Sequence, residues 1–318
     1  MSSSVTENLE NVLNMLRPFD ERRERAKERL EGEQFGHAFF FAVLGLSTSE
    51  ELLALDSVAS LRQVSDPPGE IELAGAMSNK AMMSAVARYA RSIRLELCVN
   101  REYFSNEEKA MTFAWWVITA LRVRISPYII VPLVANYSWS TIAGAPSDSC
   151  EVRLIEDVPL AHRFAEPREL LKSDMGWIAS HLANLGNLLE DTKFRMAVES
   201  LTEHHLQKSL RMAIAHLWAG IEALLGISSE LRFRISAYIA AYLEPSGPSR
   251  LETFKRVRGL YDFRSKAVHG VSLSDKEMRG HVADVQDLLS RIIVKCIESG
   301  SIPSSDQWDD LLLSGGAA

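Results

Sequence analysis

One short stretch of the sequence, YDFRSKAVHG at residues 261–270, carries an arginine and a histidine that could act on a phosphodiester bond. Metal-free cleavage of RNA needs a base for the ribose 2′-hydroxyl proton, an acid for the leaving 5′-oxygen, and a fixed cation beside the phosphate. Histidine suits the first two roles because its pKa lies near neutral pH. Arginine suits the third because it stays charged and grips phosphate oxygens with two parallel donors. His269 and Arg264 are therefore the candidate catalytic residues.

The spacing of Arg264 and His269 sets a geometric problem. Successive residues of a helix are about 100° apart, so residues five apart lie roughly 140° apart and cannot meet side by side. A helix end near Gly270 would change that geometry, and a two-fold dimer would bring two copies of each residue to one cleft. Without further context the pair is a weak signal, because Arg264 could pair with a carboxylate and His269 could cap a helix end.

The charge around this stretch differs from that of the whole chain. The formal net charge of -7 excludes a generic binder of polyanions. In residues 230–269, however, eight basic side chains face four acidic ones, a balance of 8 − 4 = +4. A local basic surface is what phosphate binding requires. The candidate RNA contacts within it are Lys255, Arg256 and Arg258.

Composition places the chain among soluble globular proteins. Of 318 residues, 47% are apolar and 24% charged, enough for two domains with sizeable cores. The three cysteines are far apart and the adjacent His204 and His205 point about 100° apart, so we expect no disulfide, metal or cofactor. The first residues are polar and acidic, which is not typical of a signal peptide. The apolar run AFFFAVLGL is too short to span a bilayer. We therefore expect a cytoplasmic protein that does not enter membranes.

The elements that must position the candidate residues indicate an α+β fold. Residues 1–32 read as a helix, whose basic stretch DERRERAKERL suits an RNA-binding arm or, more in keeping with its interleaved acids, a solvated or packing face. Residues 33–162 read as a mixed α/β domain, with helices in 79–90 and 106–123. Its expected strands lie in HAFFFAVLGL, EIELAGAM, SIRLELCVN, PYIIVPLVANYSW and CEVRLIEDV.

Residues 163–300 read as an all-α helical bundle, and residues 301–318 as a flexible tail. The long helical stretch at 192–226 is expected to break near His204. The last strong helix begins with a capping box, Ser274 and Glu277. Its apolar residues recur at intervals of three and four, which predicts one buried stripe: Val282, Val285, Leu289, Ile292 and Cys296.

Residues 195–298 resemble the ApeA-like HEPN domains, a family of helical bundles found in nucleases of microbial defence and toxin systems. LWAGIEALLG (217–226) carries Glu222 inside an apolar helix, and the helix LRFRISAYIAAYL (231–243) follows it. LYDFRSKAVHG (260–270) looks like the family's signature almost residue for residue. This order of helices and motif is far more specific than the spacing of one arginine and one histidine.

The resemblance implies a metal-independent endoribonuclease that acts on RNA as a homodimer, with Arg264 and His269 of both chains forming a composite site. Glu222 fits the family's acidic helix position, where it would orient Arg264 or His269, or make a structural ion pair within the bundle. Supporting positions are Tyr261, Ser265 and Lys266. Ser265 stands where many broader HEPN proteins carry Asn, Asp or His, so a polar helper of longer reach is missing.

No tyrosine follows His269 in GVSLSD, which argues against modification by a partner nucleotidyltransferase, as happens to some HEPN toxins. The same bundle could instead serve as a non-catalytic RNA- or nucleotide-binding or dimerisation scaffold, although the intact Arg264 and His269 favour an enzyme. We expect residues 33–162 to act as a sensor or regulatory domain that restrains the nuclease until a protein or ligand trigger binds.

Overall fold

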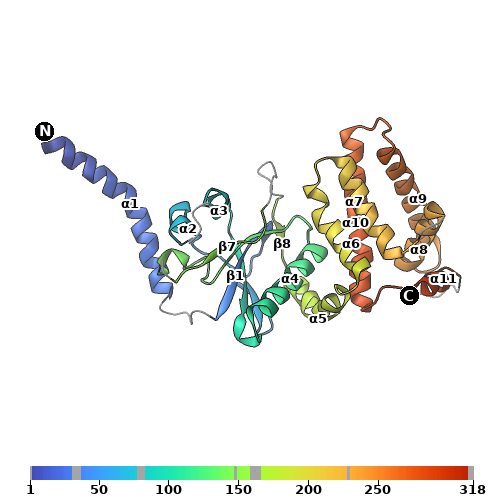
Figure 1. Ribbon diagram of the computed structural model, residues 1–318, viewed down its shortest axis with the longest axis horizontal. Coiled ribbons are helices and arrows are strands. Elements are labelled where there is room, and N and C mark those ends of the chain that lie inside the picture. The colour runs from blue at the N-terminus through green and yellow to red at the C-terminus, as the bar shows by residue number, and fades with distance from the viewer. Residues whose placement is uncertain are drawn as a thin grey trace. The chain divides into compact units, whose positions relative to one another are not determined.

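The computed structural model describes residues 2–30, 37–76, 83–146, 149–157, 166–227 and 230–313. It divides into two compact units (Figure 1): Met1–Trp115 with Ile129–Gly176, and Trp116–Tyr128 with Trp177–Ala318. The boundary crosses helices α4 (Glu107–Arg124) and α5 (Lys172–Leu188), whereas the sequence indicated a border between the α/β domain and the bundle at residues 162 and 163. The described residues form an α+β fold, as expected, with an antiparallel sheet in the N-terminal half and helices in the C-terminal part.

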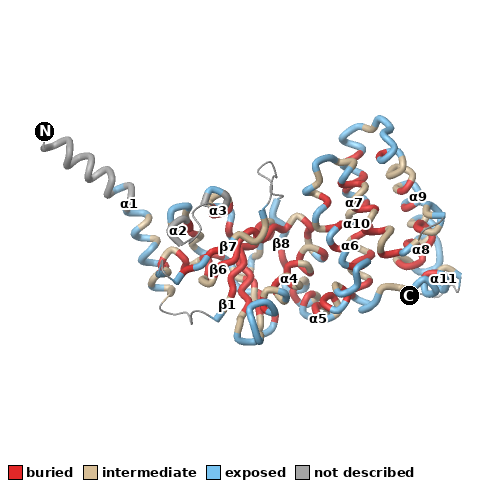
Figure 2. The backbone as a smooth tube through the Cα atoms, viewed as in Figure 1, coloured by how far each residue is buried: buried red, intermediate tan, exposed pale blue. Residues whose placement is uncertain are grey.

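The first unit is built on a six-stranded sheet in the order β3–β4–β5–β1–β6–β7, in which every neighbouring pair is antiparallel. Its strands are β1 (Ala38–Leu44), β3 (Leu52–Leu55), β4 (Ala59–Gln63), β5 (Leu95–Asn100), β6 (Ile130–Ala135) and β7 (Val152–Leu154). Strand β1 lies between β5 and β6 and is buried from Phe39 to Leu44 (Figure 2). A separate parallel pair joins β2 (Leu46–Ser47) to β8 (Arg168–Glu169).

Helix α1 (Ser2–Leu30) contacts the rest of the first unit through its basic stretch. Arg22 and Arg25 form ion pairs with Asp66 at 3.5 and 3.2 Å, and Arg22 also binds Glu72 at 3.2 Å. The backbone of α1 approaches the short helix η3 (Ile142–Gly144) so closely that a Cβ atom on Gly144 would lie 2.6 Å from the nitrogen of Lys27. This part of α1 therefore has the packing and ion-paired character that its interleaved charges favoured.

One expected strand of the first unit is wrong. EIELAGAM begins helix α2 (Glu70–Ala76), in which Leu73 is buried and Ile71 is 63% exposed. The alternation of apolar residues suggested a strand, but Pro67, Pro68 and Gly69 precede a first turn that carries two glutamates, which favours a helix start. The expected helix at 79–90 is described from Met83, as α3 (Met83–Ala90), and its earlier residues lie outside the described part of the chain.

The sequence analysis missed the hairpin of β3 and β4. Its residues, LLALDSVASLRQ, are rich in leucine and alanine, and its turn contains neither glycine nor proline. Asp56 supplies the turn with a left-handed φ of 63°, a conformation that aspartate tolerates better than most residues. Tertiary pairing with β5 therefore decides the strand state of a segment whose local propensity favours a helix.

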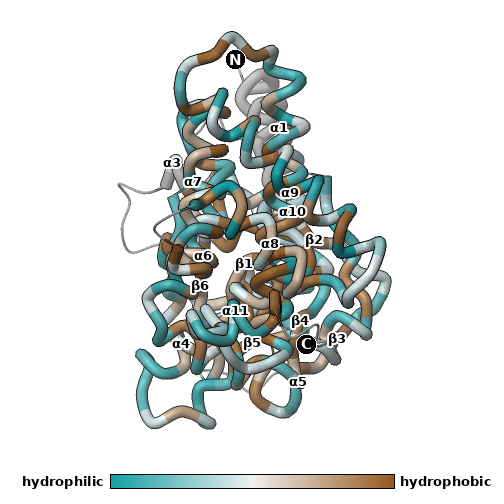
Figure 3. Tube along the Cα trace, turned by 90° about the vertical axis from the view of Figure 1, so that its right-hand side faces the viewer, coloured by the Kyte–Doolittle hydropathy of each residue, from teal (hydrophilic) through white to brown (hydrophobic). Residues whose placement is uncertain are grey.

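The second unit contains the helices expected for a bundle. They are α6 (Thr192–Glu203), α7 (Leu210–Leu225), α8 (Leu231–Leu243), α9 (Pro248–Val268), α10 (Asp275–Ser299) and α11 (Ser305–Leu313). The alternation of hydrophilic and hydrophobic residues along them can be followed in Figure 3. The break near His204 is confirmed, because a 3₁₀ turn, η4 (His204–Leu206), separates α6 from α7. The capping box of Ser274 and Glu277 and the buried stripe of α10 are also confirmed.

The described part of the expected flexible tail, residues 301–313, is not a tail, since α11 packs on α8. Residues 314–318 lie outside the described part of the chain. Trp308 is buried between two tyrosines of α8: its ring stacks on Tyr238 at 5.8 Å and meets Tyr242 edge-on at 5.1 Å. A single large aromatic side chain thus outweighs the linker-like residues around it. In the described part of the chain, no helix is both long and apolar enough to cross a membrane.

We expect Trp308→Ala to lower the free energy of unfolding by about 3–5 kcal/mol, because it removes a fully buried indole and leaves a cavity. Urea denaturation followed by circular dichroism measures this loss. Leu313→Ala is the control, since that side chain is 82% exposed and its removal should change stability by less than about 0.5 kcal/mol. Equal unfolding midpoints for Trp308→Ala and the unaltered protein would contradict the packing of α11.

Candidate active site

Helix α9 carries the motif, and it runs without interruption through Arg264 to Val268. Pro248 starts it in the first turn, where proline needs no hydrogen-bond partner. It ends in a cap in which Gly270 has a left-handed φ of 78° and the Val271 amide donates to the Lys266 carbonyl at 3.1 Å. The helix end near Gly270 thus follows His269, the C-cap residue, and leaves the helical geometry between the two candidates intact.

Arg264 lies on the inward side of α9. One of its terminal nitrogens, Nη2, is 3.1 Å from Oε1 of Glu222 on α7, and each of the two side chains is 25% exposed. The guanidinium also lies 5.5 Å from the ring centre of Tyr261. Glu222 and Arg264 therefore do form the ion pair that the sequence left as one of two interpretations, and the resulting geometry equally lets the carboxylate orient the guanidinium.

This ion pair is imperfectly satisfied. Oε1 of Glu222 is buried and accepts no well-directed hydrogen bond, and Nε of Arg264 is buried without an acceptor among the described residues. Charged groups that are partly buried and poorly paired cost free energy, so such groups in a folded protein call for an explanation. A role that needs the guanidinium to move is one explanation that fits the arrangement.

His269 lies exposed at the end of α9. Arg211, in the first turn of α7, donates from its two terminal nitrogens to the carbonyls of Ala267 and Val271, the second at 2.7 Å. A cation at a helix C-terminus satisfies carbonyls that the helix leaves free and complements its dipole. Arg211 therefore anchors the backbone on both sides of His269. Sequence analysis missed it, because nothing local marks a contact across 56 residues.

The structure does not bring Arg264 and His269 together within one chain. Helical geometry places Arg264 with the buried Val257 and Tyr261, while His269 points to the opposite, exposed side. No hydrogen bond or ion pair joins the two among the residues that the structure describes. A site that uses both therefore needs a second copy of the chain or a movement at the end of α9.

The supporting positions separate in the same way. Tyr261 is buried and meets Trp218 of α7 edge-on at 5.2 Å; burial, and secondarily the Glu222 carboxylate, raise the pKa of its hydroxyl. Ser265 contributes its carbonyl, which accepts the His269 amide at 3.0 Å. Lys266 is exposed. Tyr261 thus belongs with Arg264, and Lys266 with His269.

An exposed basic stripe runs along the outer side of α9. We define the basic stripe as Lys255, Arg258, Lys266 and His269, which fall within about 80° of arc on the helix. Asp262 lies within that arc, but both of its oxygens accept from Arg232 of α8 at 2.5 Å. The hydrogen bond from Arg232 holds the pKa of Asp262 below its usual value, and Arg258 and Lys266 act in the same direction.

The positive charge balance of residues 230–269 is reduced in the folded protein, because carboxylates from other helices pair with three of its arginines. Arg256 pairs with Asp284 of α10 at 3.0 Å, Arg264 pairs with Glu222, and Arg234 lies 3.9 Å from Asp309 of α11. Those carboxylates come from outside the 230–269 window. Of the three expected RNA contacts, Lys255 and Arg258 therefore stay on the basic stripe, whereas Arg256 is engaged by an acid.

A pocket of about 470 Å³ borders the first turn of α7. Lys208 and Arg279 stand at it, and both are exposed. His204 lies deeper, where burial lowers the pKa of its imidazole, with its Nε2 3.5 Å from the Tyr128 hydroxyl. Sequence analysis missed both cations, because Lys208 lies in the loop before α7 and Arg279 lies on α10, so they come together only in the fold.

His281 of α10 is a buried polar residue that packs against the motif helix α9. Its ring stacks on Phe263 at 4.4 Å, and its Nε2 accepts a hydrogen bond from Trp218 Nε1 at 3.2 Å. An imidazole that accepts at Nε2 is neutral, with its proton on Nδ1. Burial lowers the pKa of His281 to about 4. His281 is therefore a structural element beneath the motif.

No group of three or more metal-ligating side chains gathers anywhere in the described residues. Comparison with known proteins adds no family: no protein-family model, no curated protein and no solved structure matches the chain.

We expect the stability of the protein to fall as the pH drops from about 6.5 to about 4, partly because of His281. Its folded pKa lies below the unfolded value of about 6.5, so the unfolded chain takes up the proton first. This residue alone contributes at most about 3 kcal/mol, since one pKa unit equals about 1.4 kcal/mol. The free energies of unfolding of the unaltered protein and of His281→Gln should therefore change relative to each other by that amount between pH 7 and pH 4.

His281→Gln keeps an acceptor for Trp218 but does not titrate, so it isolates the protonation. His204 titrates in both proteins and cancels in the comparison. A difference between the two proteins that stays constant with pH would show that the pKa of His281 is the same in the folded and unfolded states.

Proposed function

We propose that this chain is a metal-independent endoribonuclease of the HEPN type, acting in microbial defence, with Arg264 and His269 of two chains forming a composite site. The observation that carries the proposal is the exposed His269 at the end of the basic stripe. Lys255, Arg258 and Lys266 would hold the phosphates of a single RNA strand and lead it to the imidazole. The motif LYDFRSKAVHG supports the family assignment, by resemblance.

The reaction in this proposal is a transesterification. The ribose 2′-oxygen forms a bond to phosphorus while the bond from phosphorus to the 5′-oxygen breaks. One His269 takes the 2′-hydroxyl proton, and the His269 of a second copy gives a proton to the leaving 5′-oxygen. The products are a 2′,3′-cyclic phosphate and a 5′-hydroxyl, so the step consumes neither water nor an oxidant.

Arg264 would stabilise the negative charge that develops on the phosphate. To do so, its guanidinium would have to leave Glu222 at least in part, because Nη2 faces that carboxylate. The imperfect hydrogen bonding of the pair lowers the cost of that movement, since few well-directed bonds are broken. Glu222 would then orient the guanidinium in the resting state and release it toward a bound phosphate.

The alternative function is a non-catalytic scaffold that binds RNA or a nucleotide, or dimerises, through the same helices. The inward position of Arg264 favours this alternative, because an ion pair within the bundle accounts for the residue without any catalysis. The basic stripe would serve RNA binding equally well in either case. Cleavage and binding must therefore be measured separately.

For an enzyme, we expect His269→Ala to abolish cleavage of a labelled single-stranded RNA in EDTA. The loss should be about 10²-fold or more, the range that a general acid or base contributes. The imidazole makes no hydrogen bond among the described residues and is exposed, so stability should change by less than about 0.5 kcal/mol. Analysis of the product ends should show 2′,3′-cyclic phosphate from the unaltered protein.

Leu313→Ala is the control for this experiment, because Leu313 is exposed and lies outside the basic stripe. Equal cleavage by His269→Ala and the unaltered protein would refute the enzymatic proposal. RNA binding without cleavage by any of the three proteins would favour the scaffold.

Two neighbouring arginines give a matched test of RNA binding. Arg258 lies on the basic stripe, whereas Arg256 is paired with Asp284. We expect Arg258→Ala to weaken RNA binding and to reduce the slope of log K against log salt by about 0.7, the value for one phosphate contact on a single strand. Arg256→Ala should leave the slope nearly unchanged. Titration of a fluorescent RNA at several salt concentrations measures both, and equal effects of the two changes would mean that the stripe is not the binding surface.

A further inference from the structure

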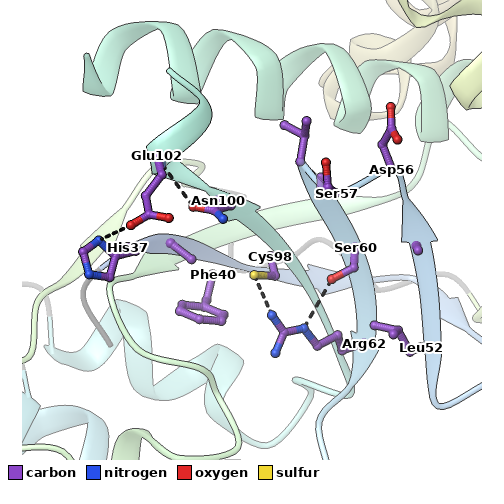
Figure 4. A pocket seen from close by; sticks show the side chains of 14 residues that line it. His37, Phe40, Leu52, Asp56, Ser57, Ser60, Arg62, Cys98, Asn100 and Glu102 are labelled. Carbon is purple, nitrogen blue, oxygen red and sulfur yellow. Dashed lines mark hydrogen bonds and ion pairs between the residues drawn. The ribbon is translucent and has the colours of Figure 1, made fainter. Parts of the chain in front are cut away.

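A pocket of about 380 Å³ opens on the sheet of the first unit, whereas the candidate active site belongs to the second unit. Figure 4 shows its side chains rising from neighbouring strands on one face of the sheet. The strand register explains this arrangement, because Phe40 of β1 and Ser60 of β4 both lie opposite Cys98 of β5. Arg62, two residues after Ser60, projects from the same face.

The pocket adjoins the hydrophobic core of the first unit, because two of its lining residues also belong to that core. Phe40 and Cys98 are buried at the edge of a hydrophobic cluster that also contains Tyr89 of α3 and Trp139. Beyond them the face carries Ser60 and Arg62, which are half-buried, and Leu52, which is 54% exposed. The pocket is therefore the part of this sheet face that lies beyond the core cluster.

Arg62 contributes a cationic side chain at one end of the pocket. Its Nε donates to Ser60 Oγ at 3.3 Å and its Nη2 donates to Cys98 Sγ at 2.7 Å. The guanidinium lies 5.7 Å from the ring centre of Phe40. Arginine has five N–H groups, so three remain for another acceptor, including both on Nη1. Among the described residues no carboxylate forms an ion pair with Arg62.

The nearest acid along the register does not neutralise this charge directly. Glu96 lies opposite Arg62 on β5, but its carboxylate is buried and accepts from the Ser138 hydroxyl and from the Trp139 amide, the latter at 2.7 Å. Other arginines of the same unit do have carboxylate partners, for example Arg153, which binds Glu107 at 2.7 Å. A half-buried arginine held by a hydroxyl and a thiol is weakly compensated.

The opposite end of the pocket has a different character. His37 pairs with Glu102 at 3.1 Å, and Asp56 stands at the turn between β3 and β4. These carboxylates accept hydrogen bonds and disfavour a second negative group. A ligand that fits would therefore carry one anionic group at Arg62 and hydrogen-bond donors at the far end, with the apolar Leu52 and Ala54 beside it.

We propose that this pocket binds a small molecule through a single anionic group, a carboxylate or a phosphate, that lies on the free edge of Arg62. The volume is within the usual range for small-molecule sites, about 300–1,000 Å³. The planar fork of the guanidinium matches two oxygens of either group. Because the pocket lies in the first unit, the proposal stands independently of ribonuclease activity.

The test uses the full chain and four probes: inorganic phosphate, adenosine 5′-monophosphate, acetate and glutamate. The first two carry phosphate and the last two carboxylate, so the pairs separate the two sources of the anion. Calorimetric titration at millimolar probe concentrations measures affinity, and the melting temperature should rise with the probe that binds. We expect at least one probe to bind the unaltered protein.

Arg62→Gln should weaken that binding by about 10- to 100-fold, the loss expected for a charge-assisted hydrogen-bonded contact. Arg153→Gln, on β7 and paired with Glu107, is the matched control and should bind as the unaltered protein does. Ala54→Trp is a second variant, which fills the pocket from an exposed position and leaves Arg62 in place.

Loss of binding in both pocket variants, with retention in Arg153→Gln, is the expected result. The proposal is overturned if no probe binds the unaltered protein, or if Arg62→Gln and Ala54→Trp bind the probe as tightly as the control. Circular dichroism of each variant confirms that the fold is kept, and Ala54→Trp decides the outcome if Arg62→Gln does not fold.

Discussion

The unbroken turn of α9 is the constraint on which the arrangement of the second unit depends. Because the helix continues from Pro248 to Val268, side chains five apart must leave it in different directions. Arg264 therefore enters the bundle with Tyr261, where α7 supplies Glu222 and Trp218 as neighbours. His269 and the three other residues of the basic stripe face outward. One helix thus separates a semi-buried polar cluster from a solvated cationic surface.

Charge in this unit is organised by contacts between helices more than by local sequence. The +4 balance of residues 230–269 suggested a uniformly basic surface, yet α7, α10 and α11 each bring a carboxylate to one of its arginines. Among the described residues, Lys255, Arg258 and Lys266 form no ion pair and lie exposed on one side of a single helix, while Arg250 donates to the Glu244 carbonyl. A small cationic strip inside a chain of -7 suits a partner that is narrow and locally charged, such as a single nucleic-acid strand.

The parts of the fold that sequence analysis found are those with local causes. The capping box at Ser274, the break after Glu203 and the stripe of α10 follow from hydrogen bonding and helical period within a few residues. The β3–β4 hairpin was missed, because pairing with β5 overrides its local helical propensity. Helix α2 was wrongly expected as a strand, because the helix start at Pro67–Pro68–Gly69 overrides its alternating pattern. At the site, the residue types of Arg264 and His269 were evident from sequence. Their opposite directions, and the anchoring by Arg211, required the packing of α7 on α9.

The two polar arrangements share a physical principle, although they belong to different units. Arg264 and Arg62 are both partly buried and both lie over an aromatic ring. Nε of Arg264 is buried without an acceptor, whereas Arg62 donates to a hydroxyl and a thiol and forms no ion pair among the described residues. A folded chain bears the cost of an incompletely bonded guanidinium at few places, because a well-placed carboxylate would remove it. At Arg264 a carboxylate is present but poorly directed, so a phosphate would compete with Glu222. At Arg62 no carboxylate is paired, so an anion would complete the hydrogen bonding without displacing anything. That difference makes Arg62 the easier of the two arginines for a small anion to reach, and Arg264 the one whose engagement requires the bundle to change.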